Sequence, residues 1–134
     1  MKIRKYNELD SKNIVEILKL NKQYDYPNVE GPDAMNRVAK CDAAISLVAE
    51  IDNRVVGYIK AIYDGSRALI HLLSVHPNYQ NIGVGSVLLK AVEGELKKRG
   101  APGATISVTD ESVGYWEKKG FKRIPVFLML KEFD

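Results

Sequence analysis

Three consecutive apolar segments in the middle of the chain predict three antiparallel strands. The segments are rich in β-branched residues and run from Ile45 to Ile51, from Arg54 to Tyr63 and from Arg67 to Val75. They are separated by Asp52-Asn53 and by Asp64-Gly65, and both pairs tolerate the positive φ angles that two-residue hairpins require. We therefore expect a three-stranded meander at the centre of a sheet.

Segments with helical periodicity lie on both sides of these strands. The first extends from Asp10, which can serve as its N-cap, to Tyr24. Its inner positions recur every three to four residues and are Ile14, Ile17, Leu18 and Asn21. We expect further helices at Asp33–Lys40 and at Gly83–Arg99, which Gly100 would end. The other expected elements are a strand at Ile3–Tyr6, a strand at Thr105–Val108, a helix at Glu111–Lys119, and one or two closing strands within Phe121–Lys131.

Composition narrows the class of protein. The chain has 134 residues, of which 46% are hydrophobic and 28% charged, as in a single soluble domain. Its formal charge of +3 is too small for a nucleic-acid-binding surface. The longest apolar run, Val126–Leu130, falls far short of the roughly 20 residues of a membrane span, and the N-terminus shows no secretory signal. The single Cys41 excludes an internal disulfide and a Cys-based metal site. We therefore expect a cytoplasmic α/β domain that binds no nucleic acid, membrane or metal.

A glycine-rich helix start follows the third strand of the meander. A short loop carries Gly83 and Gly85 onto the first turn of the long helix, where backbone N–H groups lack partners and the helix dipole adds positive charge. Glycines there let a pyrophosphate approach the backbone. The segment lacks the third glycine of a Rossmann site and the Gly-Lys-Ser/Thr of a Walker A loop. From this pattern alone, a phosphate site and an ordinary helix start both remain open.

Two motifs in order resemble the Gcn5-related N-acetyltransferase (GNAT) superfamily. Gln80-Asn81-Ile82-Gly83-Val84-Gly85 is similar to its Gln/Arg-x-x-Gly-x-Gly/Ala signature and follows its Leu-x-Val-x-Pro as Leu73–Pro77. Tyr115–Phe121 is similar to its Phe-Tyr-Glu-Lys-x-Gly-Phe block. The order of elements also matches over nearly the whole chain. The resemblance implies one N-acetyltransferase domain over residues 1–134, with a mixed, mostly antiparallel sheet of about six or seven strands and about four helices.

The resemblance also implies that acetyl-CoA is the cosubstrate and where it binds. The pantetheine arm would pair with the backbone of the strand that ends at Val75, whose N–H would polarise the thioester carbonyl. The pyrophosphate would lie on the N–H groups of the helix start, in a loop ordered by Gln80. The residues expected to contact the cofactor are Leu73, Ser74, Val75, Gln80, Asn81, Ile82, Gly83, Val84, Gly85, Ser86, Thr109 and Trp116.

Direct attack of an amine on acetyl-CoA requires a base, because a lysine-like amine has a pKa of about 10.4. His71 is the candidate, since it lies four residues before Val75 and is expected on the same face of an apolar strand. The alternative interpretation of this position is a partly buried histidine that is hydrogen-bonded to a neighbouring backbone group. Proton transfer through a water, assisted by Asp64 or Glu50, is compatible with either role.

The second motif departs from the family pattern at the position of the leaving-group acid. The family's helix tyrosine aligns with Trp116, whose indole N–H cannot supply a proton at neutral pH and which suits a core position. Tyr115 is the remaining candidate acid, although its side chain is expected to point about 100° away around the helix. Two hypotheses follow: an N-acetyltransferase, and a CoA-binding regulatory domain without catalysis.

The acceptor is expected to be a primary amine of a small molecule or a peptide. Tyr24 and Tyr26, in the loop after the first helix, are its candidate binding residues. Because only 14 residues remain from Phe121 onward, we expect an open acceptor site. The sequence leaves open whether the protein is a monomer or a homodimer. Four basic residues beside the second motif suit either the 3′-phosphate of CoA or a solvated helix face: Lys118, Lys119, Lys122 and Arg123.

Overall fold

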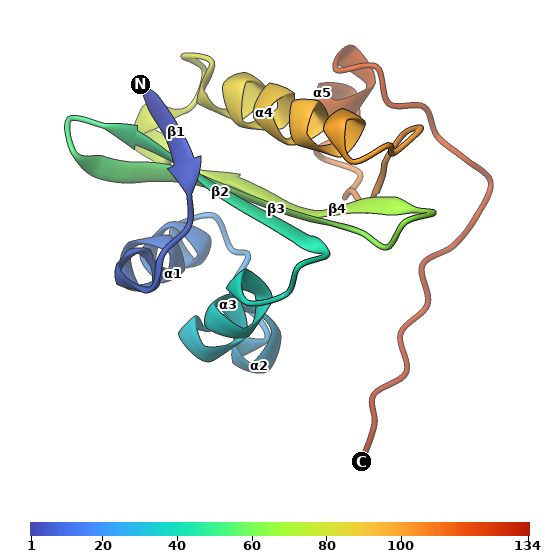
Figure 1. Ribbon diagram of the computed structural model, residues 1–134, viewed down its shortest axis with the longest axis horizontal. Coiled ribbons are helices and arrows are strands. Elements are labelled where there is room, and N and C mark those ends of the chain that lie inside the picture. Colours follow the sequence, from blue (N-terminus) through green and yellow to red (C-terminus); the bar gives the residue numbers. More distant parts are fainter.

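A single five-stranded sheet in the order β1-β2-β3-β4-β5 forms the centre of the protein (Figure 1). The computed structural model describes all residues from 1 to 134. Four strands are antiparallel neighbours: β1 (Lys2–Lys5), β2 (Ala44–Ile51), β3 (Arg54–Tyr63) and β4 (Ala68–Val75). The fifth, β5 (Thr105–Ile106), pairs with β4 in parallel. The predicted meander and the mixed, mostly antiparallel sheet are confirmed, with five strands in place of six or seven.

Helices cover both faces of the sheet (Figure 1). On one face lie α1 (Ser11–Leu20), α2 (Pro27–Glu30) and α3 (Pro32–Ala39), and on the other lie α4 (Val84–Lys98) and α5 (Val113–Lys118). The short α2 lies in a segment that was expected to be a loop. Two 3₁₀ turns, Glu8–Asp10 and Pro77–Tyr79, precede α1 and α4. None of the helices is both long and apolar enough to span a membrane.

Two apolar clusters hold the helices against the sheet. Ile59 and Ile70 pack with Leu88 on the α4 side. Tyr58 packs with Ile17 on the α1 side. Because β3 is covered on both faces, its sequence reads as a continuous apolar run rather than an alternating one.

The two hairpins of the meander differ in length. Asp52-Asn53 forms the predicted two-residue turn between β2 and β3, with φ angles of 52° and 62°. The loop between β3 and β4 has four residues, 64–67, because the last pair of the ladder is Tyr63 with Ala68. The Asp64 carboxylate accepts two backbone N–H groups of this loop at 2.7 and 2.8 Å, which lowers its pKa. The prediction of a two-residue turn here was therefore wrong.

A bulge interrupts the pairing of β3 with β4. Lys60 pairs with Leu72 and Ala61 pairs with Ile70, so His71 is an extra residue without a partner on β3. An extra residue breaks the strict alternation of side chains between the two faces of a strand. The sequence predicted that His71 and Val75, four residues apart, lie on the same face of the strand. Because of the bulge, they do not, and this prediction was wrong.

The expected closing strands within Phe121–Lys131 are absent from the sheet. The Phe121 ring packs edge-on against Trp116, with 5.4 Å between ring centroids. From Lys122 onward every residue is exposed, and the chain extends away from the sheet (Figure 1). Pro125 interrupts this segment and has no N–H to donate to a ladder. The prediction of closing strands was therefore wrong.

Candidate functional site

The loop between β4 and α4 directs backbone N–H groups outward at the start of the helix. Asn81 and Gly83 have φ angles of 65° and 93°, the left-handed conformation that asparagine tolerates and glycine favours. Gly83 is the N-cap of α4, and its carbonyl accepts the N–H of Val87. The N–H groups of the three residues between them lack intrahelical partners. They form a positively polarised surface suited to an anion.

Gly85 lies where α4, α5 and β4 come together. A methyl group at this position would lie 2.9 Å from the Tyr115 hydroxyl oxygen and 3.6 and 3.7 Å from side-chain carbons of Leu73 and Val75. Tyr115, predicted to point away, therefore reaches the helix start. The prediction of a core position for Trp116 is confirmed, since its side chain is 8% exposed and lies among buried residues.

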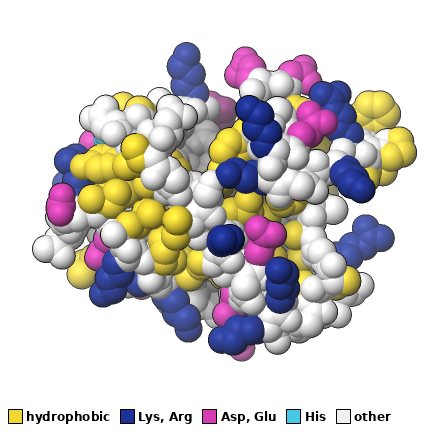
Figure 2. Space-filling model, turned by 90° about the horizontal axis from the view of Figure 1, so that it is seen from above, with side chains coloured by type: hydrophobic (Ala, Val, Ile, Leu, Met, Phe, Trp, Pro, Cys, Tyr) yellow, Lys and Arg dark blue, Asp and Glu magenta, His cyan; other side chains and the backbone are white.

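The Tyr115 phenol is protonated at neutral pH. Burial raises the pKa of Tyr115 above its usual value of 10.0, and the neighbouring Ser86 hydroxyl lowers it by less. The Lys119 ammonium group donates a hydrogen bond to Ser86 and lies 5.4 Å from the centre of the Tyr115 ring. Lys119 therefore adds a positive charge beside the first turn of α4. Other Lys and Arg side chains are scattered over this face rather than gathered (Figure 2).

The outer edge of β4 is open between His71 and Val75. The short β5 pairs only with Leu69 and Ile70. The N–H of His76 donates to the Val56 carbonyl on β3 at 2.8 Å. Since successive residues of an antiparallel strand point their N–H groups in opposite directions, the Val75 N–H is directed to the open edge.

Side chains from the end of α1 and from the loop before α4 hold this edge in place. Asn21 Nδ2 donates to Ser74 Oγ at 2.7 Å and to the Val75 carbonyl at 2.8 Å. Gln80 Nε2 donates to the same carbonyl at 2.9 Å. Gln23 Nε2 donates to the Leu73 carbonyl at 3.4 Å, and Gln23 Oε1 is buried without a partner. An unpaired buried acceptor beside an open strand edge is suited to a ligand N–H.

Asn21 and Gln23 were not among the residues predicted for the site. Asn21 had a detectable signal, because it occupies a polar position on the otherwise apolar inner stripe of the first helix. Gln23 lies beyond the end of α1 and had no such signal.

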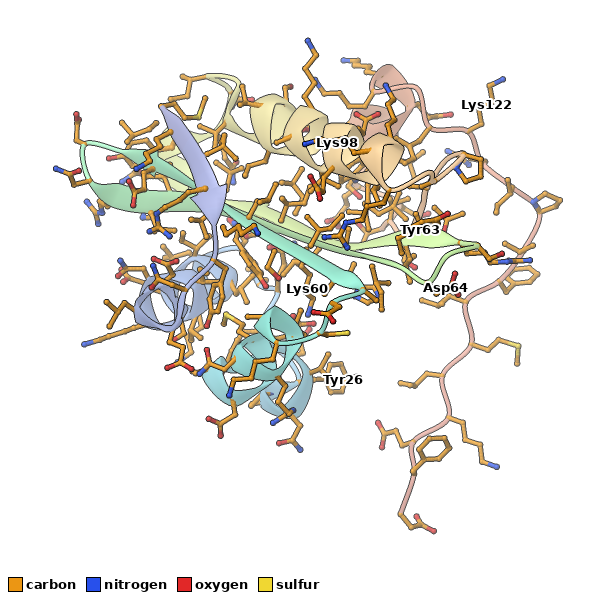
Figure 3. The ribbon with its side chains drawn as sticks, viewed as in Figure 1. Tyr26, Lys60, Tyr63, Asp64, Lys98 and Lys122 are labelled. Atoms are coloured by element: carbon orange, nitrogen blue, oxygen red, sulfur yellow. The ribbon has the colours of Figure 1, made fainter.

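A small charged cluster lies on the opposite face of the sheet, where Figure 3 shows Lys60 between the sheet and the α2–α3 pair. The buried Lys60 of β3 has its Nζ atom 3.7 Å from a carboxylate oxygen of Glu30, at the end of α2. Although His71 is partly exposed to solvent, partial burial lowers its pKa below 6.5, the Lys60 ammonium lowers this pKa further, and the Glu30 carboxylate raises it by less. The His71 imidazole is therefore neutral at pH 7 and lies near these two charges.

The acetyltransferase (GNAT) domain family has a model that matches residues 19–126. The chain belongs to this family. Acetyl transfer is the reaction of the family, and acetyl-CoA is its cosubstrate.

Solved structures with the GNAT fold cover nearly the whole chain. A transcriptional regulator from Bacillus halodurans C-125 is 22% identical over 98% of this chain and 99% of its own, with a TM-score of 0.83. The PaiA N-acetyltransferase from Thermoplasma acidophilum, in complex with coenzyme A, is 19% identical over 94% and 92%, with a TM-score of 0.84. An aminoglycoside 6′-acetyltransferase of type Ii is 21% identical over 91% and 83%, with a TM-score of 0.75.

The residues of this GNAT chain at the β4–α4 junction fit the chemistry of acetyl-CoA. Gly85 leaves open a space that a side chain would fill against Tyr115 and β4. Lys119 and the N–H groups of the first turn of α4 suit a pyrophosphate. The unpaired Gln23 Oε1 suits an amide N–H of a pantetheine arm.

Several predicted residues of this GNAT chain lie outside the junction. Thr109 Oγ1 hydrogen-bonds to Ser112 Oγ at 3.2 Å, at the start of α5. Glu50 accepts a hydrogen bond from Arg4 at 2.7 Å, and it lies on β2, which β3 separates from β4. Because the carboxylate of Asp64 is held by its own loop, neither carboxylate is placed to assist His71.

The two acceptor-site tyrosines lie around α2. Tyr24 borders a cavity of about 260 Å³ between α2 and α3, which Asn28 and Arg37 also line. Tyr26 precedes α2 and is half exposed (Figure 3). Neither side chain forms a hydrogen bond to the β4 edge, and both lie on the same side of the sheet as Glu30.

Proposed function

We propose that this chain is an N-acetyltransferase that transfers the acetyl group of acetyl-CoA directly to a primary amine. The observation that carries the proposal is the convergence at the open edge of β4. The outward N–H of Val75, the first turn of α4 and the protonated Tyr115 hydroxyl all lie at this junction. These are a donor for a developing oxyanion, a site for phosphate and an acid for a leaving group.

The β4–α4 junction would hold the cosubstrate in an extended form. The N–H groups of the first turn of α4 and the Lys119 ammonium would bind the pyrophosphate. The backbone of Leu73 and the Gln23 Oε1 atom would bind the pantetheine amides, and the backbone N–H of Val75 would face the thioester. Acetyl-CoA supplies a thioester, whose carbonyl carbon is the electrophile.

The Val75 N–H would stabilise the negative charge that develops on the carbonyl oxygen, an effect worth about 2.7–4 kcal/mol per donor. His71 is neutral at pH 7 because its pKa is lowered, so it can take the proton of the attacking ammonium, directly or through a water. The Tyr115 phenol would hydrogen-bond to the departing sulfur and protonate it.

The acceptor would approach from the α2–α3 side, opposite the cofactor. The Glu30 carboxylate, which also pairs with Lys60, would attract an ammonium group to that side, and the Tyr24 and Tyr26 rings would flank the approach. The aminoglycoside 6′-acetyltransferase of the same fold is named for a small molecule that carries amines, which supports a small-molecule acceptor. A peptide amine is the other acceptor to be tested.

Calorimetry with acetyl-CoA, followed by an assay of CoA release over a panel of amines, tests the proposal. The panel contains aminoglycosides, polyamines, amino-acid amides and short peptides with free N-termini. We expect saturable binding of acetyl-CoA and release of CoA with at least one amine. Binding without turnover on any amine would instead support the regulatory, non-catalytic hypothesis, and absence of binding would refute the site.

Replacement of Val75 separates its backbone from its side chain. Val75→Pro removes the N–H that is directed to the open edge and also fixes φ at the end of β4, while Val75→Ala retains the N–H and shortens the side chain. We expect kcat to fall by about 10²–10³ in Val75→Pro and to change little in Val75→Ala, with both variants folded by circular dichroism. Equal activity of the two variants would exclude the oxyanion role.

A further inference from the structure

Lys60 of β3 places a positive charge in the interior of the protein with one loosely held partner. The residue is 6% exposed, and its Nζ atom lies 3.7 Å from a Glu30 carboxylate oxygen, which is beyond the usual hydrogen-bonding distance. A buried charge destabilises a fold unless it is both paired and hydrogen-bonded. The Lys60 ammonium therefore has N–H donors that are available to a ligand.

Two hydroxyl groups on the same face of the sheet also lack hydrogen-bond partners. The Tyr58 hydroxyl and Ser46 Oγ are buried without a partner, and the whole of Tyr58 is 1% exposed. Ser46 is directly opposite Lys60 in the ladder between β2 and β3, and Tyr58 lies two residues before Lys60. Even a hydrogen bond between the two hydroxyls would occupy only one of their two O–H groups. At least one O–H donor is therefore free on the face that carries the Lys60 ammonium.

The Glu30 carboxylate connects these donors to the surface. Burial raises the pKa of Tyr58 to about 12, the Ser46 hydroxyl lowers it by less, and the Glu30 carboxylate is among the groups that raise it, so the phenol is a donor at neutral pH. The Glu30 side chain is 21% exposed and His71 is exposed, whereas the Lys60 side chain is 7% exposed. The cluster therefore has donors at its buried end, and a carboxylate with a neutral imidazole at its solvent-facing end.

We propose that the acceptor is an amino acid, whose carboxylate binds Lys60, Tyr58 and Ser46 while its ammonium group binds Glu30. The inference rests on the proposed function, because it names the class of amine that the same site acetylates. Lys60 and Glu30 are neighbours, so the two charges of the ligand must be only a few bonds apart, as they are in an amino acid. A zwitterion of this size enters the loose ion pair with each charge opposite its complement.

The same cluster discriminates against an amine that has no carboxylate. Such an amine takes the Glu30 carboxylate and leaves the Lys60 ammonium buried without a counter-charge, which is more costly than an unpaired charge in water. Specificity therefore arises from the penalty on the wrong ligand as well as from the contacts of the right one.

Binding in this orientation brings the amine beside the candidate base, since the Glu30 carboxylate lies near His71. The nitrogen forms a C–N bond with the carbonyl carbon of the thioester as the C–S bond breaks. Of the two protons that the ammonium nitrogen loses, one passes through His71 to solvent, and the other replaces the proton that Tyr115 gives to the departing sulfur. The products are CoA and an N-acetyl amino acid.

Matched sets of amines test the preference for a carboxylate. Each set contains an amino acid, its amide and the amine that lacks the carboxyl group: alanine, alaninamide and ethylamine; phenylalanine, phenylalaninamide and phenethylamine; lysine, lysinamide and cadaverine. CoA release is measured with acetyl-CoA, and binding is measured by calorimetry in the presence of CoA. We expect at least one amino acid to bind more tightly, and to have a higher kcat/KM, than its amide and its carboxylate-free amine.

The outcomes separate this inference from the proposed function. Acetylation of amines with no preference for a carboxylate in any set would overturn the inference and leave the proposed function standing. Absence of CoA release with every amine, including the aminoglycosides and polyamines, would refute the proposed function and the inference with it.

Tyr58→Phe and Tyr6→Phe distinguish a ligand-binding hydroxyl from a structural one. The Tyr6 hydroxyl donates to Asn36 Oδ1 at 2.6 Å, and the rings of Tyr6 and Tyr58 have centroids 6.1 Å apart. Tyr58→Phe should not lower the melting temperature, because its hydroxyl has no partner to lose. It should lower kcat/KM for the amino acid, relative to that for the carboxylate-free amine, by about 10–100-fold. Tyr6→Phe should lower the melting temperature and leave this ratio unchanged. A ratio that Tyr58→Phe does not change would contradict the assignment.

Lys60→Met tests the cation. The ratio of the two kcat/KM values is taken within one variant, so the accompanying change in the pKa of His71 affects both amines alike. We expect the amino acid to lose its advantage over the carboxylate-free amine by a factor of at least ~30, as when one partner of a buried charge pair is removed. A Lys60 with a purely structural role would lower the activity toward both amines equally, and that result would refute the carboxylate site.

Discussion

Gly85 offers a direct test of the β4–α4 junction, because a side chain there fills the proposed cofactor site without disturbing the backbone. Gly85 lies in the first turn of α4 and, unlike Gly83, does not have a positive φ angle. The methyl group of Gly85→Ala would lie 2.9 Å from the Tyr115 hydroxyl oxygen, which must retreat by about 0.5 Å to restore ordinary contact. Since the hydroxyl ends a flexible side chain, the variant should fold. Its affinity for acetyl-CoA should fall.

Gly85→Glu adds a negative charge beside the expected pyrophosphate. Two unit charges about 4 Å apart interact by ~1 kcal/mol in water and by ~4 kcal/mol near a protein surface. The affinity for CoA should therefore fall by a factor between about 5 and about 1,000. Gly94 provides the matched control, because it lies in the same helix with no atom within 4 Å of an added methyl group.

Calorimetric titration of CoA into the four variants Gly85→Ala, Gly85→Glu, Gly94→Ala and Gly94→Glu gives the affinities. Gly94→Ala should raise the melting temperature by about 3–5 °C, since alanine favours a helix by about 1 kcal/mol over glycine, and should leave CoA binding unchanged. Gly94→Glu makes the same change in net charge as Gly85→Glu. If folded Gly85→Glu binds CoA as tightly as Gly94→Glu does, the phosphate is not at the start of α4.

Three further replacements test the packing and the chemistry. Gly57→Ala places a methyl group 2.9 Å from a Leu88 methyl carbon, so urea denaturation should show a loss of about 1–3 kcal/mol in the free energy of unfolding. An unchanged value would contradict the packing of α4 on β3. Tyr115→Phe should lower kcat by about 10²–10⁴ with little change in the KM for acetyl-CoA, and an unaltered kcat would exclude Tyr115 as the acid. Lys60→Met removes a cation that lowers the pKa of His71, so this pKa should rise in an NMR titration. The acid limb of kcat/KM should then move to higher pH, and an unmoved titration would exclude the influence of Lys60.

The central strands are predictable from the sequence because their signals are local. Apolar β-branched runs stop at residues whose backbone preferences define the turn, and Asp52-Asn53 adopts the expected positive φ angles. The β3–β4 loop is longer than predicted because the Asp64 carboxylate accepts two N–H groups from within the loop. A side-chain cap of this kind competes with the tight hairpin, and residue type alone does not decide between them.

For the candidate site, the sequence predicts the backbone at the start of α4 but not which side chains face it. Glycines at positions 83 and 85 predict a helix start that an anion can approach, and this prediction does not depend on which residues pack around the helix. Whether Tyr115 or Trp116 faces that start depends on how α5 docks. Here the indole fits among buried residues against Phe121, which leaves the phenol directed at Gly85. This choice rests on tertiary packing that no local pattern encodes.

The displaced His71 follows from one extra residue in the ladder. A period-two argument holds only while the register is unbroken, and the bulge opposite Lys60 and Ala61 breaks it. Downstream of the bulge, Leu73 and Val75 pack against the α4-side core, while His71 lies near Lys60 and Glu30 on the α2–α3 side. In the proposed reaction, the bulge allows the single strand β4 to contact both acetyl-CoA and the acceptor amine. Its open edge would hold the thioester, and its extra residue would meet the amine from the other face.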